Sequence, residues 1–138
     1  MSVKFKAVER VNPRDLTLPK KFYAKLESGD DVSFEELADL ISKVSNLNYG
    51  EVTGALGTLI EIIEIQLRHG RPVRLSTLGT FYLTLNSEGY DSEEELTSDA
   101  IRKANIRFRP GKRLKKMIRT LDYVKVDSIS FEQKSFLD

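Results

Sequence analysis

The chain has 138 residues, a mass of 15.7 kDa and nearly balanced charge, with 22 Lys and Arg against 21 Asp and Glu, which is typical of one domain. It contains no cysteine and one histidine, which excludes disulfides, thiolate chemistry and sulfur-ligated metals and leaves little scope for imidazole catalysis. No apolar stretch is long enough to span a membrane and no signal-peptide core begins the chain, so we expect a cytoplasmic protein that is not an enzyme and needs no cofactor or metal.

The first elements that the sequence predicts are two half-buried β-strands. Apolar and charged residues alternate with period two over 3–8 and again over 21–26. A loop that contains Asn12, Pro13 and Pro19 joins the two segments. The edges of such strands can pair with a partner protein or with a second copy of the chain.

Two helices are expected next. A capping-box spacing that begins at Ser33 starts a helix that runs to about Val44. A second such spacing begins at Asn48 and starts a longer helix, which His69 and Gly70 end. Both helices are acidic on their outer faces.

Beyond the second helix, the pattern predicts a small sheet with a projecting arm. Strands are expected at 73–75 and at 80–85, and a further strand follows the alternation at 106–109. The segment 86–99 between the last two strands holds six acids and no base. It is predicted to be a projecting loop or a flexible arm tip.

The most strongly charged segment lies at 100–119, where nine Lys and Arg occur without one acid. The segment covers the strand at 106–109 and a helix expected after Pro110, where the amides of Gly111 and Lys112 would suit an anion. Phosphates of a nucleic acid are the ligands that this pattern favours. The alternative is a basic face that balances the acidic helices of the same protein or of its partner. A last short strand is expected at 124–126.

The order of these elements and two short motifs resemble the HU/integration-host-factor family of bacterial nucleoid proteins. The resemblance covers roughly 33–119 and is carried by three groups of residues: Gly70 with Val73-Arg74-Leu75, then Leu78-Gly79-Thr80-Phe81, and finally Phe108, Gly111, Lys112, Leu114 and Lys115. The chain looks like an extended HU-related variant with an added N-terminal strand segment. We therefore expect a β extension at 1–32, an HU-like DNA-binding domain at 33–119 and a C-terminal tail at 120–138.

This resemblance implies an α+β fold with two N-terminal helices, a β-sheet saddle with an arm, and a C-terminal basic helix, assembled as an intertwined homodimer. It also implies an architectural, histone-like protein of the nucleoid that holds double-stranded DNA between its arms. The residues that would approach phosphates are Arg107, Arg109, Gly111, Lys112, Arg113 and Lys116, with Arg102 and Lys103 on the arm and Arg71 and Arg74 on the first strand. Contacts of this kind make binding salt-dependent and largely independent of sequence.

The arm departs from the family's pattern. The family bends DNA with a proline at each arm tip, whereas no proline lies between Phe81 and Phe108, and six acids occupy that region instead. The alternative function is therefore an HU-fold protein-interaction or structural module that has lost DNA bending. RNA is a further alternative partner, because it offers the same phosphate charge. Phe81 and Phe108 themselves are assigned to the core under the saddle rather than to base stacking.

A homodimer also has a physical motive. Two helices and a few strands cannot easily enclose a core of their own, so the apolar stripe of the second helix should face a partner subunit. The residues expected in that interface are Leu56, Leu59, Ile60, Ile63 and Leu67.

Overall fold

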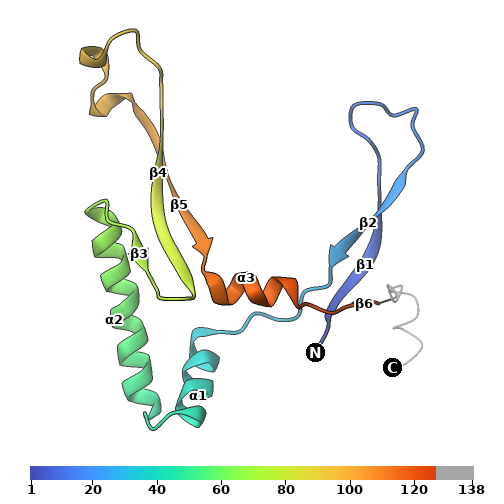
Figure 1. Cartoon of the computed structure of the whole chain (residues 1–138), viewed down its shortest axis with the longest axis vertical. Coiled ribbons are helices and arrows are strands. Elements are labelled where there is room, and N and C mark those ends of the chain that lie inside the picture. Colours follow the sequence, from blue (N-terminus) through green and yellow to red (C-terminus); the bar gives the residue numbers. More distant parts are fainter. Residues whose placement is uncertain (127–138) are drawn as a thin grey trace. The chain divides into compact units, whose positions relative to one another are not determined.

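The computed structural model describes residues 1–126, which belong to two compact units (Figure 1). One unit is Val32–Arg119, and the other combines Met1–Asp31 with the segment that begins at Thr120. Among residues 1–126, no helix has both the length and the apolar character that a membrane crossing requires. The elements are β1 (Val3–Arg10), β2 (Lys21–Leu26), α1 (Phe34–Val44), α2 (Tyr49–Arg68), β3 (Val73–Arg74), β4 (Gly79–Ser87), η1 (Glu93–Glu95), η2 (Ser98–Ala100), β5 (Ile101–Pro110), α3 (Lys112–Arg119) and β6 (Tyr123–Lys125).

The unit that holds both described ends of the chain is a three-stranded sheet with the order β2-β1-β6. β1 runs antiparallel to β2 and parallel to β6. The backbone N–H of Val3 donates to Asp122 and that of Val126 donates to Phe5, each at 2.8 Å, so β6 is held along the free side of β1. The two N-terminal strands and the final strand are confirmed as elements, the final one beginning one residue earlier than expected.

The two faces of this sheet differ in chemistry. One face is apolar and surrounds an open depression of about 430 Å³ lined by Val3, Phe5, Ala24, Leu26 and Tyr123.

The prediction that β2 is half-buried was wrong, because β2 is an edge strand whose six residues are all exposed. Its Leu26 is 58% exposed.

The two helices begin where their side-chain caps predict. The Ser33 hydroxyl accepts the backbone N–H of Glu36 at 3.1 Å at the start of α1. At the start of α2 the capping box is complete: the Glu51 N–H donates to the Asn48 side chain at 2.9 Å, and the Asn48 N–H donates to the Glu51 carboxylate at 3.0 Å. Beyond α2, Gly70 takes a φ of +74°, which lets the chain turn towards β3.

The second sheet has the order β3-β4-β5, and its long β4–β5 hairpin runs away from α1 and α2 as a two-stranded arm (Figure 1). Pairing continues from Gly79 opposite Pro110 to Asn86 opposite Lys103, where the register shifts. The loop predicted at 86–99 is therefore partly wrong: β4 extends to Ser87, and η1 and η2 form the arm tip. The apolar–polar alternation of β4 ends at Leu85, whereas its backbone pairing with β5 continues to Ser87.

Few side chains are buried among residues 1–126. α2 leaves Ile60, Ile62 and Ile65 exposed by 57%, 48% and 49%. A chain of this size normally encloses several large apolar side chains, so one copy leaves much of its apolar surface in water. The buried apolar residues among 1–126 are Ala38, Val52, Leu67 and Ala100.

Candidate nucleic-acid interface

One face of the β3-β4-β5 sheet gathers cations from different strands. Residues directly opposite each other in an antiparallel pair share a face. The register places Thr80 between Arg74 and Arg109, and it places Tyr82 opposite Arg107. Farther along the arm, the same face continues through two more pairs. We call this surface the arm basic face; its residues are Arg74, Thr80, Tyr82, Thr84, Asn86, Lys103, Asn105, Arg107 and Arg109.

The opposite face of the arm is apolar. The Phe81 and Phe108 rings lie on it with their centroids 5.0 Å apart and their planes tilted by 47°. Leu83, Leu85 and Ile106 extend this face towards the tip. The two aromatic rings therefore pack against each other on the side away from the cations, although Phe108 stays 41% exposed in a single copy.

Contacts within the arm basic face orient its side chains. The Arg109 guanidinium lies 5.2 Å from the centroid of the Tyr82 ring, a cation–π arrangement. The Asn105 amide donates to the Asn86 side chain at 3.3 Å across the two strands. Arg109 is thus held above the sheet while it remains exposed to solvent, which is a suitable state for a phosphate contact.

At the base of the arm, the basic face meets the start of α3 in a shallow depression of about 400 Å³. Lys112 and Lys115 line it from one side of α3, and Arg74 and Arg109 line it from the sheet. The hydroxyl residues Ser76, Thr77 and Thr80 also line the depression. Lys115 was not among the predicted site residues, although its spacing of three from Lys112 on a helix would have indicated a shared face.

The role of Gly111 in the structure differs from the expected role. Its backbone N–H donates to the Leu78 carbonyl at 2.8 Å, and the Arg113 N–H donates to the Thr77 carbonyl at 3.2 Å. The Gly111 amide is therefore not free to bind an anion, and that expectation was wrong. A Cβ at Gly111 would lie 2.6 Å from the Thr77 carbonyl carbon. Glycine at this position therefore allows α3 to approach the turn between β3 and β4 and places Lys112 beside that turn.

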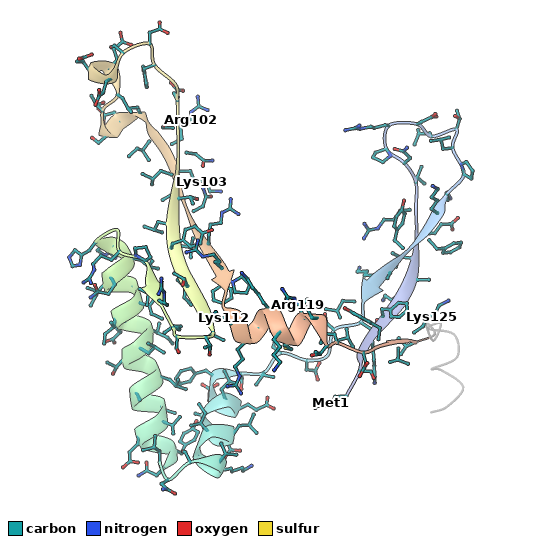
Figure 2. The ribbon with its side chains drawn as sticks, in the orientation of Figure 1. Met1, Arg102, Lys103, Lys112, Arg119 and Lys125 are labelled. Atoms are coloured by element: carbon teal, nitrogen blue, oxygen red, sulfur yellow. The ribbon has the colours of Figure 1, made fainter. Side chains whose placement is uncertain are left out.

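The structure does not bring every predicted residue into this surface. Arg102 lies at the register shift, where its guanidinium pairs with Glu88 through a 3.1 Å bond from Nε and a second, shorter bond. Arg71 follows α2, and its guanidinium donates to the Gln66 side chain at 3.1 Å. Arg113 and Lys116 are exposed on α3 but do not line the depression. Figure 2 shows Arg102 and Lys103 on the arm and Lys112 at the start of α3.

The arm tip has the opposite charge. Six exposed acids lie between Glu88 and Asp99, beyond the last cation of the basic face. The described residues contain no group of His, Asp or Glu that could hold a metal ion. The arm is therefore positive along its base and negative at its end, and Arg102 offsets part of the negative charge through Glu88.

The unit Val32–Arg119 thus consists of two helices, a sheet with a two-stranded arm and a basic helix, in the order that the sequence predicts. The profile of the HU-HIG family, described as an HU domain fused to a wHTH, Ig or glycine-rich motif, matches residues 1–125, and the chain belongs to this family. The predicted relation to HU proteins is thereby confirmed at the level of the HU domain.

Among solved structures, the chain is similar to a protein from Bacteroides vulgatus ATCC 8482 that is provisionally described as a bacterial DNA-binding protein. The TM-score is 0.62 at 14% sequence identity, and the match covers 95% of this chain and 52% of that protein. The chain therefore spans about half the length of the protein it matches, and the likeness concerns the fold. A search of curated proteins found no match.

Proposed function

We propose that this HU-HIG protein is a non-enzymatic DNA-binding protein that contacts the phosphate backbone of double-stranded DNA with little sequence preference. The observation that carries the proposal is the arm basic face, where four cations from β3 and β5 share one side with hydroxyl and amide groups. These are the side-chain types that contact phosphate oxygens in protein–DNA complexes. Membership of an HU-domain family and the structural likeness to a protein described as DNA-binding support it. A nucleoid-associated, architectural role in the cytoplasm follows from this proposal.

Fluorescence anisotropy with a labelled duplex of about 30 base pairs tests this function directly. The logarithm of the affinity should fall steeply and linearly with the logarithm of salt concentration between about 50 and 300 mM, because each neutralised phosphate adds about 0.9 to the slope. A matched RNA duplex and a four-way DNA junction as competitors distinguish DNA from RNA and straight from bent DNA. Absence of binding at the lowest salt would refute the proposal.

We further propose that the functional form is a homodimer joined through the apolar stripe of α2. Leu59 and Ile60 are 37% and 57% exposed, and Leu56 and Ile63 are half-buried in one copy. Leu67, at 8% exposure, is already packed inside its own chain, so it would support the interface rather than form its surface. Burial of these side chains against a second copy would supply the core that one copy lacks.

At micromolar concentration, light scattering should give twice the chain mass of 15.7 kDa. Ile60→Glu is expected to shift the protein towards the monomer and to lower its melting temperature, because a carboxylate would enter an apolar interface. Thr58→Glu adds the same charge to the same helix on the side away from the stripe and should leave the mass unchanged. A 15.7 kDa particle that unfolds cooperatively would refute the proposed homodimer.

A second candidate function is a protein-interaction or structural module that has lost DNA bending. The acidic, proline-free arm tip favours it, because six carboxylates would repel a phosphate backbone. Glu93→Gln, Glu94→Gln and Glu95→Gln together should raise duplex affinity several-fold at low salt if the tip approaches DNA. The control variant, Glu35→Gln with Glu36→Gln and Glu61→Gln, removes three acids from the helices. Equal duplex affinity in the arm-tip variant and in this control would instead favour an arm tip that contacts protein.

A further inference from the structure

The sheet β2-β1-β6 carries a second basic surface, opposite its apolar face. Strand alternation and the β1–β2 register place the side chains of Lys4, Lys6 and Arg10 on the same side as those of Lys21 and Lys25. Val8 and Tyr23 lie among them. We call these seven residues the N-terminal basic face.

This face has a large excess of positive charge. Glu27, opposite Lys4, forms an ion pair of 3.3 Å with Lys6. Glu9 belongs to the other face, because it lies opposite Phe22. Lys4, Lys21, Lys25 and Arg10 are all exposed. The face therefore presents five cations against one acid.

Protection of a sheet edge explains only part of this pattern. Lysines on an edge strand discourage pairing with other chains, which could account for those on β2. Over Val3–Phe5, however, β1 has a strand on each side, and Lys4 lies there. Lys6 and Arg10 lie beyond the residues of β1 that pair with β6, but protection of an edge does not require them to share one face with Lys4, Lys21 and Lys25.

The dimensions and chemistry of the face match a phosphate backbone. From Lys4 to Arg10, β1 advances six residues, or about 20 Å. A DNA duplex carries one charge per about 1.7 Å of its axis, so about 12 phosphate charges lie along that length. The Arg10 guanidinium lies 5.8 Å from the centroid of the Tyr23 ring, which orients it over the sheet as Arg109 is oriented over Tyr82.

We propose that the N-terminal basic face is a second surface of this protein that binds the DNA phosphate backbone. The inference rests on the proposed DNA binding and assigns part of it to a segment outside the HU-like unit. An anionic lipid surface fits less well, because a membrane-binding face places large apolar side chains beside its cations. Here those side chains, such as Phe5, Phe22 and Leu26, lie on the opposite side of the sheet.

The test compares three variants of the full chain. Lys4→Gln with Lys21→Gln and Lys25→Gln removes three charges from the face. Arg14→Gln with Lys20→Gln and Lys125→Gln removes three charges from the same unit but outside the face, from the β1–β2 loop and from the position opposite Phe5. A third variant replaces Lys4, Lys21 and Lys25 by arginine and so keeps the charge.

We expect the salt slope of duplex binding to fall by as much as about 2.7 in the glutamine face variant, and to change by less than about 1 in the control. The arginine variant should keep the slope of the unmodified chain, which shows that charge and not folding is responsible. If the unmodified chain binds duplex and the face and control variants have equal slopes, the inference fails while the proposed function stands. If the unmodified chain does not bind duplex at all, both fail. Loss of binding to phosphatidylserine vesicles in the face variant, with duplex affinity unchanged, would overturn the inference in favour of a membrane.

Discussion

Replacement of Lys103 and Arg107 by glutamine is expected to weaken duplex binding about 60-fold at about 0.1 M salt. Both cations lie on the arm basic face, opposite Asn86 and Tyr82. Each phosphate contact contributes about 0.9 to the slope of log affinity against log salt, which corresponds to about eightfold between 1 M and 0.1 M. Loss of two contacts should therefore also lower the slope by about 1.8.

A matched control removes two cations from the helices of the same unit. Lys43 pairs with Asp39 at 2.8 Å and Arg68 pairs with Glu64 at 2.9 Å, both exposed and both spaced by four residues. Exposed pairs of this kind contribute little to stability, so Lys43→Gln with Arg68→Gln should fold normally and bind DNA with an almost unchanged slope. Equal slopes in the two double variants would show that the arm basic face does not touch the duplex.

The helices could be predicted because their signals are local. Asn48 and Glu51 are three residues apart, and the hydrogen bonds of the capping box form between those same residues. Gly70 ends α2 by a backbone conformation of its own. No distant part of the chain is needed for either feature, so the sequence pattern was sufficient.

The grouping of the cations could not be predicted in the same way. The run at 100–119 identified the charged residues, but the strand register decides which of them share a face. Arg102 alternates with Lys103 and so does not share its face, and the register shift at Asn86 and Ser87 places it beside Glu88, 14 residues away. The spacing of Lys115 from Lys112 indicates that the two share a side of α3, but only the contact of α3 with the β3–β4 turn shows that this side faces Arg74 and Arg109.

Large apolar side chains that the sequence assigns to a core are partly exposed in the structure. Period and composition place apolar residues on α2 and on the arm, and for the arm the prediction agrees with the apolar face of β4 and β5. Ile60 and Phe108, however, are 57% and 41% exposed. Hydrophobic patterning indicates which residues are to be buried, but it does not indicate whether they are buried by the same chain or by a partner.

Gly111→Ala is expected to destabilise the unit Val32–Arg119 by about 1–3 kcal/mol, because the added Cβ would meet backbone that cannot move independently. It would lie against the Thr77 carbonyl group, 2.6 Å from its carbon and 3.1 Å from the Gly79 nitrogen. Relief of that clash would require α3 to move away from the turn and would break the bond from the Gly111 N–H to Leu78. Lys112 would move with it, so duplex affinity should fall together with stability.

Gly54→Ala is the matched control for this change. Gly54 lies within α2, and a Cβ there would meet nothing within 4 Å, so alanine should stabilise the helix by up to about 1 kcal/mol. Urea denaturation of both variants, followed by circular dichroism, measures the difference. If Gly111→Ala unfolded at the same urea concentration as the unmodified chain, the close approach of α3 to the β3–β4 turn would be disproved, and with it the placement of Lys112 and Lys115 beside the arm basic face.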